Sequence, residues 1–382
     1  MAIFNKSPIW VGARWTLGAR SYRGRLEFIE SPRYIYFGPG AILKTAEVLR
    51  NISPPCRVLV VTGGENTSKI AYRLAHVIEE EGYSYNVISV NSNPSVKLLE
   101  RMFSEARSYN ASLLVAVGGG KVIDVGKLLA HWLGVKYVSV PTSASHDGIA
   151  SPAVGFLLAK RVTEVKGREY ATPPSPTAIV ADTEVIARAP PHLLRAGVGD
   201  LVSKITATKD WLLAHHLKDE VYSEYAASMA LLSAKIVMDH ADQIRPGLEE
   251  SVRIVVKALI GSGTAISIAG NSRPASGSEH MFSHALDILG EMKGTPTAPH
   301  GIQCALGTIM MAYLQGQDWE YIRERLAMAG VPVTAEEAGL DPESVIKALT
   351  IAHKIRDRYT ILGETGIAEA AARRLAKVTG VI

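Results

Sequence analysis

Four side chains in the second half of the sequence have the types and spacing of a metal-binding group. Asp200 lies in RAGVGDLVSK, His280 and His284 lie in SGSEHMFSHAL, and His300 lies in APHG. Because one helical turn separates His280 from His284, a helix would project both from one face. Asp200, His280 and His300 offer a carboxylate and two imidazoles, which suit a borderline divalent ion such as Zn²⁺. Three protein ligands would leave one coordination position open, as in catalytic zinc sites.

Each of these residues also has an ordinary explanation. A histidine can simply be a core residue with satisfied hydrogen bonds, and Asp200 can be a carboxylate near the start of a helix. That explanation has to account for the whole group together. The two cysteines, Cys56 and Cys304, are far apart and lack CxxC spacing, which argues against a disulfide framework and against a thiolate metal site. Their number fits a reducing, cytoplasmic location.

A glycine-rich turn in the first half of the sequence is suited to binding an anion. The apolar run SLLVAV leads directly into GGGK (118–121) and then into the helical pattern VIDVGKLLAHWL. Glycines between a strand and a helix let the backbone approach a ligand, and the free amide groups at the helix start face a phosphate or pyrophosphate. The turn matches neither the Rossmann GxGxxG nor the Walker pattern, and it could be only a tight turn.

A second polar segment, VPTSASHDGIASPAV (140–154), follows the next predicted strand. Thr142, Ser143 and Ser145 supply hydroxyls where a nucleotide could lie, and Asp147 could bind a hydroxyl of a polyol. The alternative is a turn rich in serine and threonine, with Asp147 as a local cap.

The order of the predicted elements indicates an α/β fold. Strands at 34–38, 57–63, 85–90, 112–118 and 136–140 alternate with helices at about 41–51, 67–81, 95–108 and 121–133. This alternation predicts βαβ units around a mainly parallel sheet, whose ligands bind beyond the carboxyl ends of the strands. Between about 150 and 182, FLLAK, the basic stretch KRVTEVKGR and TAIVAD indicate a bridging hairpin.

After residue 182 nearly the whole sequence has a helical pattern. Helices are expected at 184–188, 192–215, 219–243, 249–271, 276–290, 300–316, 318–329, 335–338, 342–358 and 366–378. We therefore predict a basic N-terminal extension (1–30), a dinucleotide-binding α/β domain (31–182) and an all-helical metal- and substrate-binding domain (183–382). A cleft between the two domains would place the metal opposite the strand ends.

Composition narrows the class of protein. The chain has 382 residues, 47% of them hydrophobic and 20% charged, which fits a folded protein of two domains. The 41 basic and 37 acidic side chains give a net charge of +4, too mild and too scattered to predict nucleic-acid binding. No uninterrupted apolar run approaches the ~20 residues of a membrane span, and the N-terminus lacks the apolar core of a signal peptide. An apolar helical domain of this size favours a homo-oligomer.

Four motifs together resemble the archaeal sn-glycerol-1-phosphate dehydrogenases. They are VGGGKVIDVGK, VPTSASHDGIASPAV, AGVGDLVSKITA and SRPASGSEHMFSHAL, and the resemblance extends over roughly residues 30 to 382. That family belongs to the superfamily of iron-containing alcohol dehydrogenases, glycerol dehydrogenase and dehydroquinate synthase. It reduces dihydroxyacetone phosphate with NADH or NADPH to sn-glycerol 1-phosphate, the backbone of archaeal membrane lipids.

The resemblance implies a role for each matching residue. Asp200, His280 and His300 would bind Zn²⁺, and Asp147, Asp200 and His284 would border the substrate, with His284 and Asp147 as the catalytic side chains. The nicotinamide coenzyme would lie against Gly118, Gly119, Gly120, Lys121, Val122, Ile123, Asp124, Thr142, Ser143, Ala144, Ser145 and Ser151, with the first two glycines shaping the turn.

Sequence differences separate the members of the superfamily. Iron-dependent alcohol dehydrogenases typically have a histidine four residues after the first ligand, where this chain has Lys204. Dehydroquinate synthases have a glutamate at the first ligand, and glycerol dehydrogenase lacks the SGSEHMFSH form. The alternatives are a polyol dehydrogenase that acts on an unphosphorylated substrate, a dehydroquinate synthase-like cyclase, and a catalytically inactive nucleotide-binding module.

The expected reaction makes two demands on the protein. The metal would polarise the C2 carbonyl of the substrate, the coenzyme would supply the hydride, and His284 would relay a proton or hold a substrate hydroxyl. The substrate phosphate also needs a cation. The residues available for it in the sequence are Lys204, Arg273, Lys160, Arg161 and Lys166.

Overall fold

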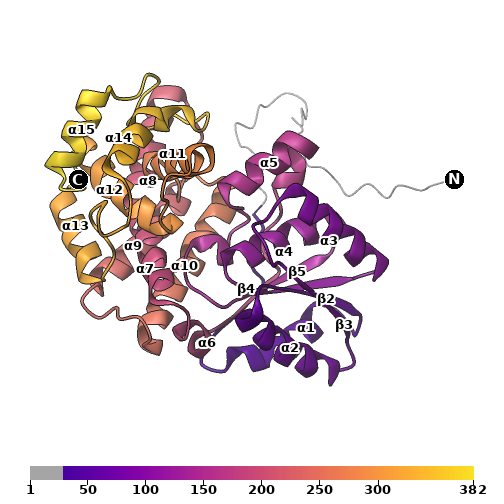
Figure 1. Ribbon diagram of the computed structural model, residues 1–382. Coiled ribbons are helices and arrows are strands. Elements are labelled where there is room, and N and C mark those ends of the chain that lie inside the picture. Colours follow the sequence, from indigo (N-terminus) through magenta and orange to yellow (C-terminus); the bar gives the residue numbers. More distant parts are fainter. Residues whose placement is uncertain (1–28) are drawn as a thin grey trace, which may run out of the picture.

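The computed structural model describes residues 29–382 and has a parallel sheet joined to a set of packed helices (Figure 1). The predicted N-terminal extension lies almost entirely outside the described residues. The sheet has six strands in the order β1-β6-β5-β4-β2-β3, all parallel. The strands are β1 (Tyr34–Gly38), β2 (Arg57–Thr62), β3 (Ser84–Ser89), β4 (Leu113–Gly118), β5 (Lys136–Pro141) and β6 (Ala178–Asp182). The predicted α/β fold with a parallel sheet is confirmed.

Helices cover both faces of this sheet. A short 3-10 helix, η1 (Ala41–Lys44), leads into α1 (Thr45–Ile52), which shares one face with α2 (Glu65–Glu79). The other face carries α3 (Val96–Ser108), α4 (Gly120–Leu133) and α5 (Phe156–Lys166), as Figure 1 shows. Every residue of β4 is buried, as expected for a strand covered on both sides.

The predicted hairpin between 150 and 182 is wrong. FLLAKRVTEVK forms α5, which buries Leu158 and Val162, two residues spaced by one helical turn. The 3-10 helices η2 (Asp147–Ile149) and η3 (Arg168–Ala171) flank α5. AIVAD is the sixth strand of the sheet, and it pairs in parallel with both β1 and β5. The helix was not recognised in the sequence because the charged side chains of KRVTEVKGR lie on its exposed polar face or just after it.

The chain after β6 is helical, as predicted. The helices are α6 (Thr183–Ala187), α7 (Pro191–Val202), α8 (Lys204–Lys218), α9 (Glu224–Asp239), α10 (Glu249–Ala269), α11 (Ser278–Lys293), α12 (His300–Leu314), α13 (Trp319–Met328), α14 (Pro342–Ile351), η4 (Ala352–Lys354) and α15 (Glu369–Val378). The predicted helix 192–215 is interrupted at Ser203, and the predicted helix 335–338 is a turn.

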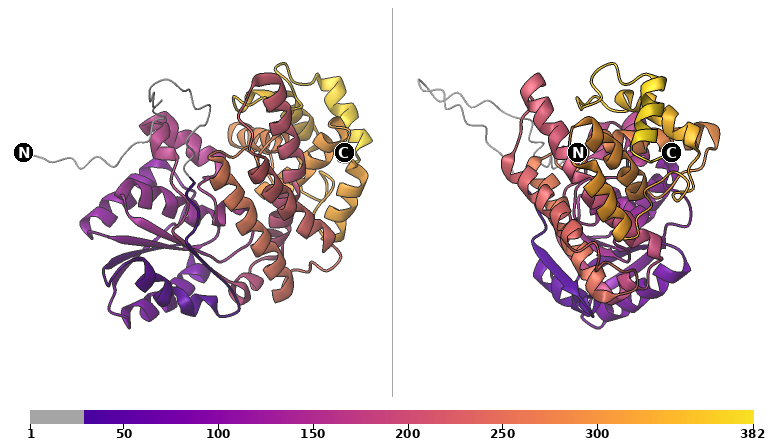
Figure 2. Two further views of the ribbon diagram at one scale, coloured as in Figure 1. Left: turned by 180° about the vertical axis from the view of Figure 1, so that it is seen from behind. Right: turned by 90° about the vertical axis from the view of Figure 1, so that its left-hand side faces the viewer.

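The two parts of the structure share a packed boundary, which Figure 2 shows from two further directions. The large helical core includes Ile179 and Ala181 of β6 as well as residues of α7, α10, α11 and α12. The helix α10 is, within residues 29–382, long and apolar enough to cross a membrane, but 61% of that stretch is buried inside the protein. Such burial is the pattern of a core helix. The division into domains at residue 182 stays an interpretation.

Candidate metal and coenzyme site

A cavity of about 570 Å³ lies between the carboxyl edge of the sheet and the helices that follow it. From the sheet side it is lined by Lys121, Asp124, His146, Asp147 and Gly148. From the helical side it is lined by Asp200, His280, His284, Asp287, His300 and Arg356. The predicted cleft, with the proposed metal ligands opposite the strand ends, is therefore present in the structure.

The three predicted metal ligands come from three helices and meet at one end of this cavity. Asp200 lies in α7, His280 in the first turn of α11, and His300 is the first residue of α12. Nε2 of His280 lies 3.5 Å from Oδ1 of Asp200, and the His280 and His300 rings are 5.0 Å apart between centroids. His280 and Asp200 are buried. Separations of this size suit donors that share one small cation.

Neighbouring side chains orient both imidazoles. The buried carboxylate of Glu279 lies 2.8 Å from Nδ1 of His280, and the Ser283 hydroxyl lies 3.1 Å from Nδ1 of His300. A hydrogen bond at Nδ1 fixes the ring and leaves Nε2 as the donor atom for a metal. This is the arrangement found around histidine ligands of zinc, and it supports the fit between this donor set and a divalent ion. Glu279 was not predicted as a site residue, although it adjoins His280 directly.

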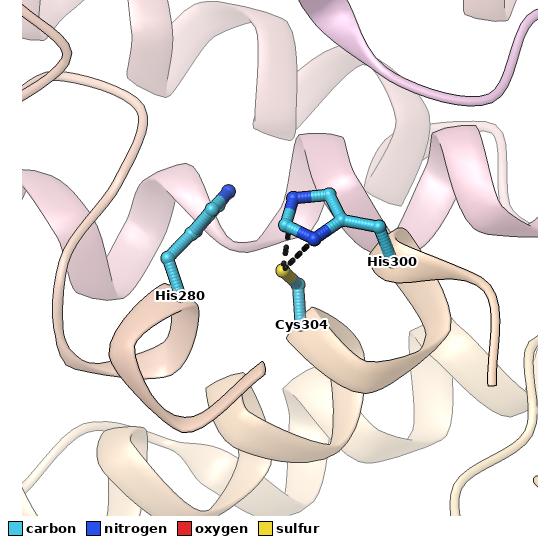
Figure 3. A group of neighbouring side chains, drawn as sticks. All are labelled: His280, His300 and Cys304. Atoms are coloured by element: carbon cyan, nitrogen blue, oxygen red, sulfur yellow. Dashed lines mark hydrogen bonds between the residues drawn. The ribbon is translucent and has the colours of Figure 1, made fainter. Parts of the chain in front are cut away.

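Cys304 adds a sulfur atom beside the two histidines, as Figure 3 shows. It lies one turn after His300 on α12, and its Sγ is 3.6 Å from Nε2 of His300. His280, His300 and Cys304 each offer a donor atom within 4.8 Å of the others. Burial raises the pKa of the Cys304 thiol, which favours the protonated form. The sequence argued against a thiolate metal site because the two cysteines lack CxxC spacing. It gave no indication that Cys304 lies beside His280 and His300.

Lys204 is paired with two carboxylates beside the predicted ligands. Its Nζ lies 3.0 Å from Oδ1 of Asp200 and 3.0 Å from Oδ2 of Asp147, and its side chain is fully buried. Burial would raise the pKa of Asp200, but Lys204 and then His280 hold it well below its ordinary value. Oδ2 of Asp200 also accepts the backbone N–H of Asp147 at 2.9 Å. Asp200 is therefore ionised and rigidly held, as a metal ligand requires.

Asp147 lines the cavity, but its carboxylate already has partners. Its Oδ2 accepts a hydrogen bond from the Ser262 hydroxyl at 2.8 Å in addition to its contact with Lys204. It therefore joins η2 to α10 as well as facing the cavity.

His284 lines the cavity beside His280 and His300. Its ring stacks on Phe156 of α5 at 4.3 Å and on His300 at 5.5 Å between centroids. A guanidinium nitrogen of Arg356 lies 3.2 Å from Nε2. Because arginine can only donate, Nε2 accepts and Nδ1 carries the proton. Burial and then Arg356 hold the pKa of His284 well below its ordinary value, so the ring is neutral.

The Nδ1–H group of His284 is a buried donor without a hydrogen bond to any described residue. Oδ2 of Asp287 lies 3.8 Å away, which is too far for a hydrogen bond. A buried donor in this state costs free energy unless a ligand or water satisfies it. His284 therefore presents an unused proton donor at the cavity wall.

The predicted coenzyme residues gather at the carboxyl ends of β4 and β5. The backbone N–H of Thr142 donates to the carbonyl oxygen of Gly118 at 3.0 Å, which holds the two segments side by side. A Cβ atom at Gly120 would lie 2.0 Å from Nε2 of His146, so the glycine permits a close approach. The side chains of Ile123 and Ala144 lie in hydrophobic cores, so only their backbones can face a coenzyme.

The structure adds a second glycine pair to this region. Gly63 and Gly64 follow β2, the strand next to β4. From β2 the chain adds β3 on one side of the sheet and then β4 on the other side, so the strand order reverses between β2 and β4. A Cβ atom at Gly63 would lie 3.2 Å from a methyl carbon of Val122, so the two glycine turns are neighbours. Nucleotides bind at such a reversal of strand order. The sequence pattern placed Gly63 at the end of a strand and gave no indication of a role for Gly64.

All five basic residues considered for a substrate phosphate already have carboxylate partners. Lys204 is enclosed by carboxylates, and Arg273 is paired with Glu220. The remaining three lie on α5, where each is paired with a glutamate: Lys160 with Glu164, Arg161 with Glu291 and Lys166 with Glu100.

Comparison with known proteins agrees with this geometry. The model of the iron-containing alcohol dehydrogenase family matches residues 36–190. Glycerol-1-phosphate dehydrogenase of Korarchaeum cryptofilum is 60% identical over 316 residues, which cover 83% of this chain and 99% of the relative. The corresponding protein of Hyperthermus butylicus is 48% identical over 94% of this chain and 99% of its own length.

Solved structures show the same fold at lower identity. Glycerol dehydrogenase of Schizosaccharomyces pombe has a TM-score of 0.76 and 20% identity, covering 93% of this chain and 91% of its own. Sulfoacetaldehyde reductase of Bifidobacterium kashiwanohense, solved with NAD⁺, has a TM-score of 0.68 and 17% identity over 93% of this chain and 99% of its own. With relatives this similar over almost their whole length, the chain belongs to the glycerol-1-phosphate dehydrogenase family.

Proposed function

We propose that this protein catalyses the reversible reduction of dihydroxyacetone phosphate to sn-glycerol 1-phosphate with NADH or NADPH. The observation that carries the proposal is the cavity itself. It brings a carboxylate and two oriented imidazoles into one cavity with Lys121 and Asp124, which follow the glycine turn after β4. The names of the relatives, which specify glycerol-1-phosphate and NAD(P)⁺, supply the substrate and the coenzyme.

We propose that Asp200, His280 and His300 hold one Zn²⁺ and that the glycine turns hold the coenzyme. When bound, Zn²⁺ supplies Lewis-acid polarisation of the C2 carbonyl, and the reduced nicotinamide supplies the hydride. Glu279 and Ser283 keep the two imidazoles oriented through their Nδ1 atoms. Lys204 balances the charges of Asp200 and Asp147, which limits the negative charge that an anionic substrate meets.

The role that we propose for His284 is to donate a hydrogen bond or a proton at Nδ1. This atom carries the proton because Nε2 accepts from Arg356, and it has no other partner among the described residues. The substrate oxygen at C2 gains negative charge during reduction and must finally be protonated. A positioned donor at this point stabilises that charge. Asp147 borders the substrate and helps to hold Lys204 in place.

For the coenzyme, we propose that the backbone of the turn after β4 binds the pyrophosphate. The amide groups at the start of α4 have no partners within the helix, and they carry the positive end of its dipole. The Thr142–Ser145 segment and Ser151 would contact the same molecule. Oxidation of NADH with dihydroxyacetone phosphate as the substrate tests the reaction directly. We expect turnover that a chelator abolishes and that added Zn²⁺ restores; a metal-replete protein inactive on this substrate would refute the proposal.

A cytoplasmic location and a homo-oligomeric state complete the proposal. The location is supported by Cys56 and Cys304, which are both free thiols. Self-association is supported by large apolar side chains exposed on α9, where Tyr225 is 67% and Leu232 is 57% exposed.

A further inference from the structure

Three positively charged side chains other than histidine line the cavity, among residues 29–382. Lys121 donates to Oδ1 of Asn93 at 2.6 Å beside the glycine turn. Arg161 is paired with Glu291 across the cavity mouth. Arg356 differs from Arg161, because no described carboxylate oxygen lies within 4.0 Å of its guanidinium. Lys121 also has no described carboxylate partner, but it lies beside the glycine turn, whereas Arg356 lies against His284 and Phe156. Arg356 is therefore the cation beside His284 whose charge has no described carboxylate partner.

Aromatic groups hold the Arg356 guanidinium in place. Its Cζ atom lies 5.1 Å from the centroid of the Phe156 ring, and Phe156 stacks on His284. A nitrogen of the guanidinium donates to Nε2 of His284 at 3.2 Å. Such contacts orient a guanidinium without neutralising it, unlike the carboxylate partners of Lys204. Arg356 is therefore positioned at the cavity wall with its charge available.

The surroundings make an anion the expected partner. Burial lowers the pKa of Arg356 to about 10, which reports the cost of keeping this charge away from water. Arg358 lies nearby and donates to the Ser272 hydroxyl and to the carbonyl oxygen of Ser276, two residues that line the cavity. Two guanidinium groups without a carboxylate salt bridge at one wall create a positive potential that a phosphate dianion would balance.

We propose that Arg356 binds the phosphate group of the substrate, and that it is the residue by which the enzyme selects a phosphorylated over an unphosphorylated triose. This inference rests on the proposed function. The position suits it, because Arg356 contacts His284 and His284 stacks on His300. A substrate whose carbonyl oxygen faces the proposed metal site would carry its phosphate, a few bonds away, past His284 to this guanidinium. A bidentate contact between arginine and phosphate has the geometry for this task.

The test compares Arg356→Met, Arg356→Lys and Arg161→Met in zinc-loaded protein with saturating coenzyme. Methionine preserves packing against Phe156 and removes the charge, so we expect KM for dihydroxyacetone phosphate to rise about 10- to 100-fold. Lysine keeps the charge but not the paired donors, so its KM should fall between those of wild type and Arg356→Met. Arg161→Met is the matched control, because its charge is already paired, and KM should change less than about threefold.

Two further measurements separate phosphate binding from a structural role. KM for unphosphorylated dihydroxyacetone should stay within about twofold of wild type in Arg356→Met, because that substrate lacks the group that Arg356 contacts. Inorganic phosphate should raise the Tm of wild type and of Arg161→Met but not that of Arg356→Met. An equal rise in KM for both substrates, or a phosphate-dependent Tm shift retained in Arg356→Met, would overturn the inference.

The failure of the proposed function would look different. In that case wild type would not oxidise NADH or NADPH with dihydroxyacetone phosphate, whatever residue stands at 356. The phosphate-dependent Tm shift and its loss in Arg356→Met would then still establish an anion site at this residue. An active wild type in which Arg356→Met changes neither KM nor the Tm shift would leave the reaction intact and exclude Arg356 as its phosphate anchor.

Discussion

The two walls of the cavity come from different parts of the fold and carry different side chains. The sheet wall presents Lys121, Asp124, His146, Asp147 and Gly148, which lie next to the glycine turn after β4 and in the segment after β5. The helical wall consists of ionisable side chains, among them Asp200, His280, His284, His300 and Arg356. We infer that the first wall binds the coenzyme through shape and amide groups, whereas the second binds the metal and the substrate through charge and proton donors.

Two buried cations of the helical part, Lys204 and Arg356, differ in how their charges are balanced. Lys204 has two carboxylate partners, and its pKa is raised above the ordinary value despite burial. Arg356 has no described carboxylate partner, and burial lowers its pKa. A buried cation with carboxylate partners stabilises those carboxylates, whereas a buried cation without them is available to bind an anionic ligand. Substitutions on the helical wall should therefore affect chemistry and affinity separately.

The largest effect is expected from His284→Ala. Losing a positioned proton donor typically costs ~10²–10⁴-fold in turnover, and we expect a loss of that size. The zinc content should stay at the wild-type level, because His284 is not one of the proposed ligands. His300→Ala serves as the contrasting variant and should lose both zinc and activity. A zinc-replete His284→Ala protein with full turnover would show that the orphan Nδ1–H has no role in the reaction.

The sequence alone predicts the two walls of the cavity to different extents. The coenzyme wall is formed by short contiguous motifs, so GGGK after a strand already indicated its place and its chemistry. The helical wall is assembled from three helices, and its proposed ligands were predicted because Asp200, His280 and His300 lie in recognisable motifs and could together hold one divalent ion. Glu279 and Arg356 were missed because their importance depends on tertiary neighbours: His280 for one, and Phe156 and His284 for the other.

Errors in the predicted elements have a comparable cause. The α5 segment was taken for a hairpin because its charges obscured a narrow apolar stripe, yet Phe156 of this helix reaches His284. The sixth strand was not recognised as part of the sheet because one neighbour, β1, lies far from it in the sequence, and the unrecognised helix α5 separates it from the other, β5. Strand pairing at long range cannot be derived from local periodicity.

A smaller loss is expected from Glu279→Gln on the helical wall. The carboxylate lies against Nδ1 of His280, and replacing such a partner of a ligating histidine typically lowers metal affinity about 10- to 100-fold. Competition with a chelator would measure this change in Kd for Zn²⁺. Coenzyme affinity should remain near that of wild type, because the substitution lies on the other wall. Unchanged zinc affinity would mean that His280 is oriented by other contacts.

On the sheet wall, Gly120→Ala should weaken coenzyme binding about tenfold, since overpacking of this kind costs ~1–3 kcal/mol. The new Cβ would collide with the His146 ring, which also accepts the backbone N–H of Gly148 at 3.0 Å. That collision should also lower the Tm of Gly120→Ala. The double variant Gly120→Ala, His146→Ala removes the collision and should recover the wild-type Tm. Fluorescence titration with NADH measures Kd. A Kd that recovers together with Tm would show that the collision, and not the approach of the coenzyme to Gly120, explains the glycine.

The smallest effect, on stability, is expected from Asp287→Asn at the rim of the helical wall. Burial raises the pKa of Asp287 to about 6, so the folded state retains a proton that the unfolded chain releases near pH 4. The stability that the protonated carboxyl contributes is present at pH 4 and is lost as the pH rises through about 6. Asparagine cannot ionise and can still accept the 2.9 Å hydrogen bond from Gln303. Its advantage in the free energy of unfolding should therefore be near zero at pH 4 and about 1–2 kcal/mol at pH 7.

Asp341 provides the opposite case for the same experiment. It caps α14, and hydrogen bonds from the Ser344 hydroxyl and backbone lower the pKa of its carboxyl. The stabilisation from its ionised form is present at neutral pH and is lost as the pH falls through the lowered pKa. Asp341→Asn should therefore lose stability relative to wild type as the pH rises, whereas Asp287→Asn gains it. Urea unfolding of the three proteins between about pH 2.5 and pH 7 would reveal the two slopes, the Asp341 slope below about pH 4 and the Asp287 slope above it. Parallel curves for wild type and Asp287→Asn would show that this carboxyl keeps an ordinary pKa beside His284.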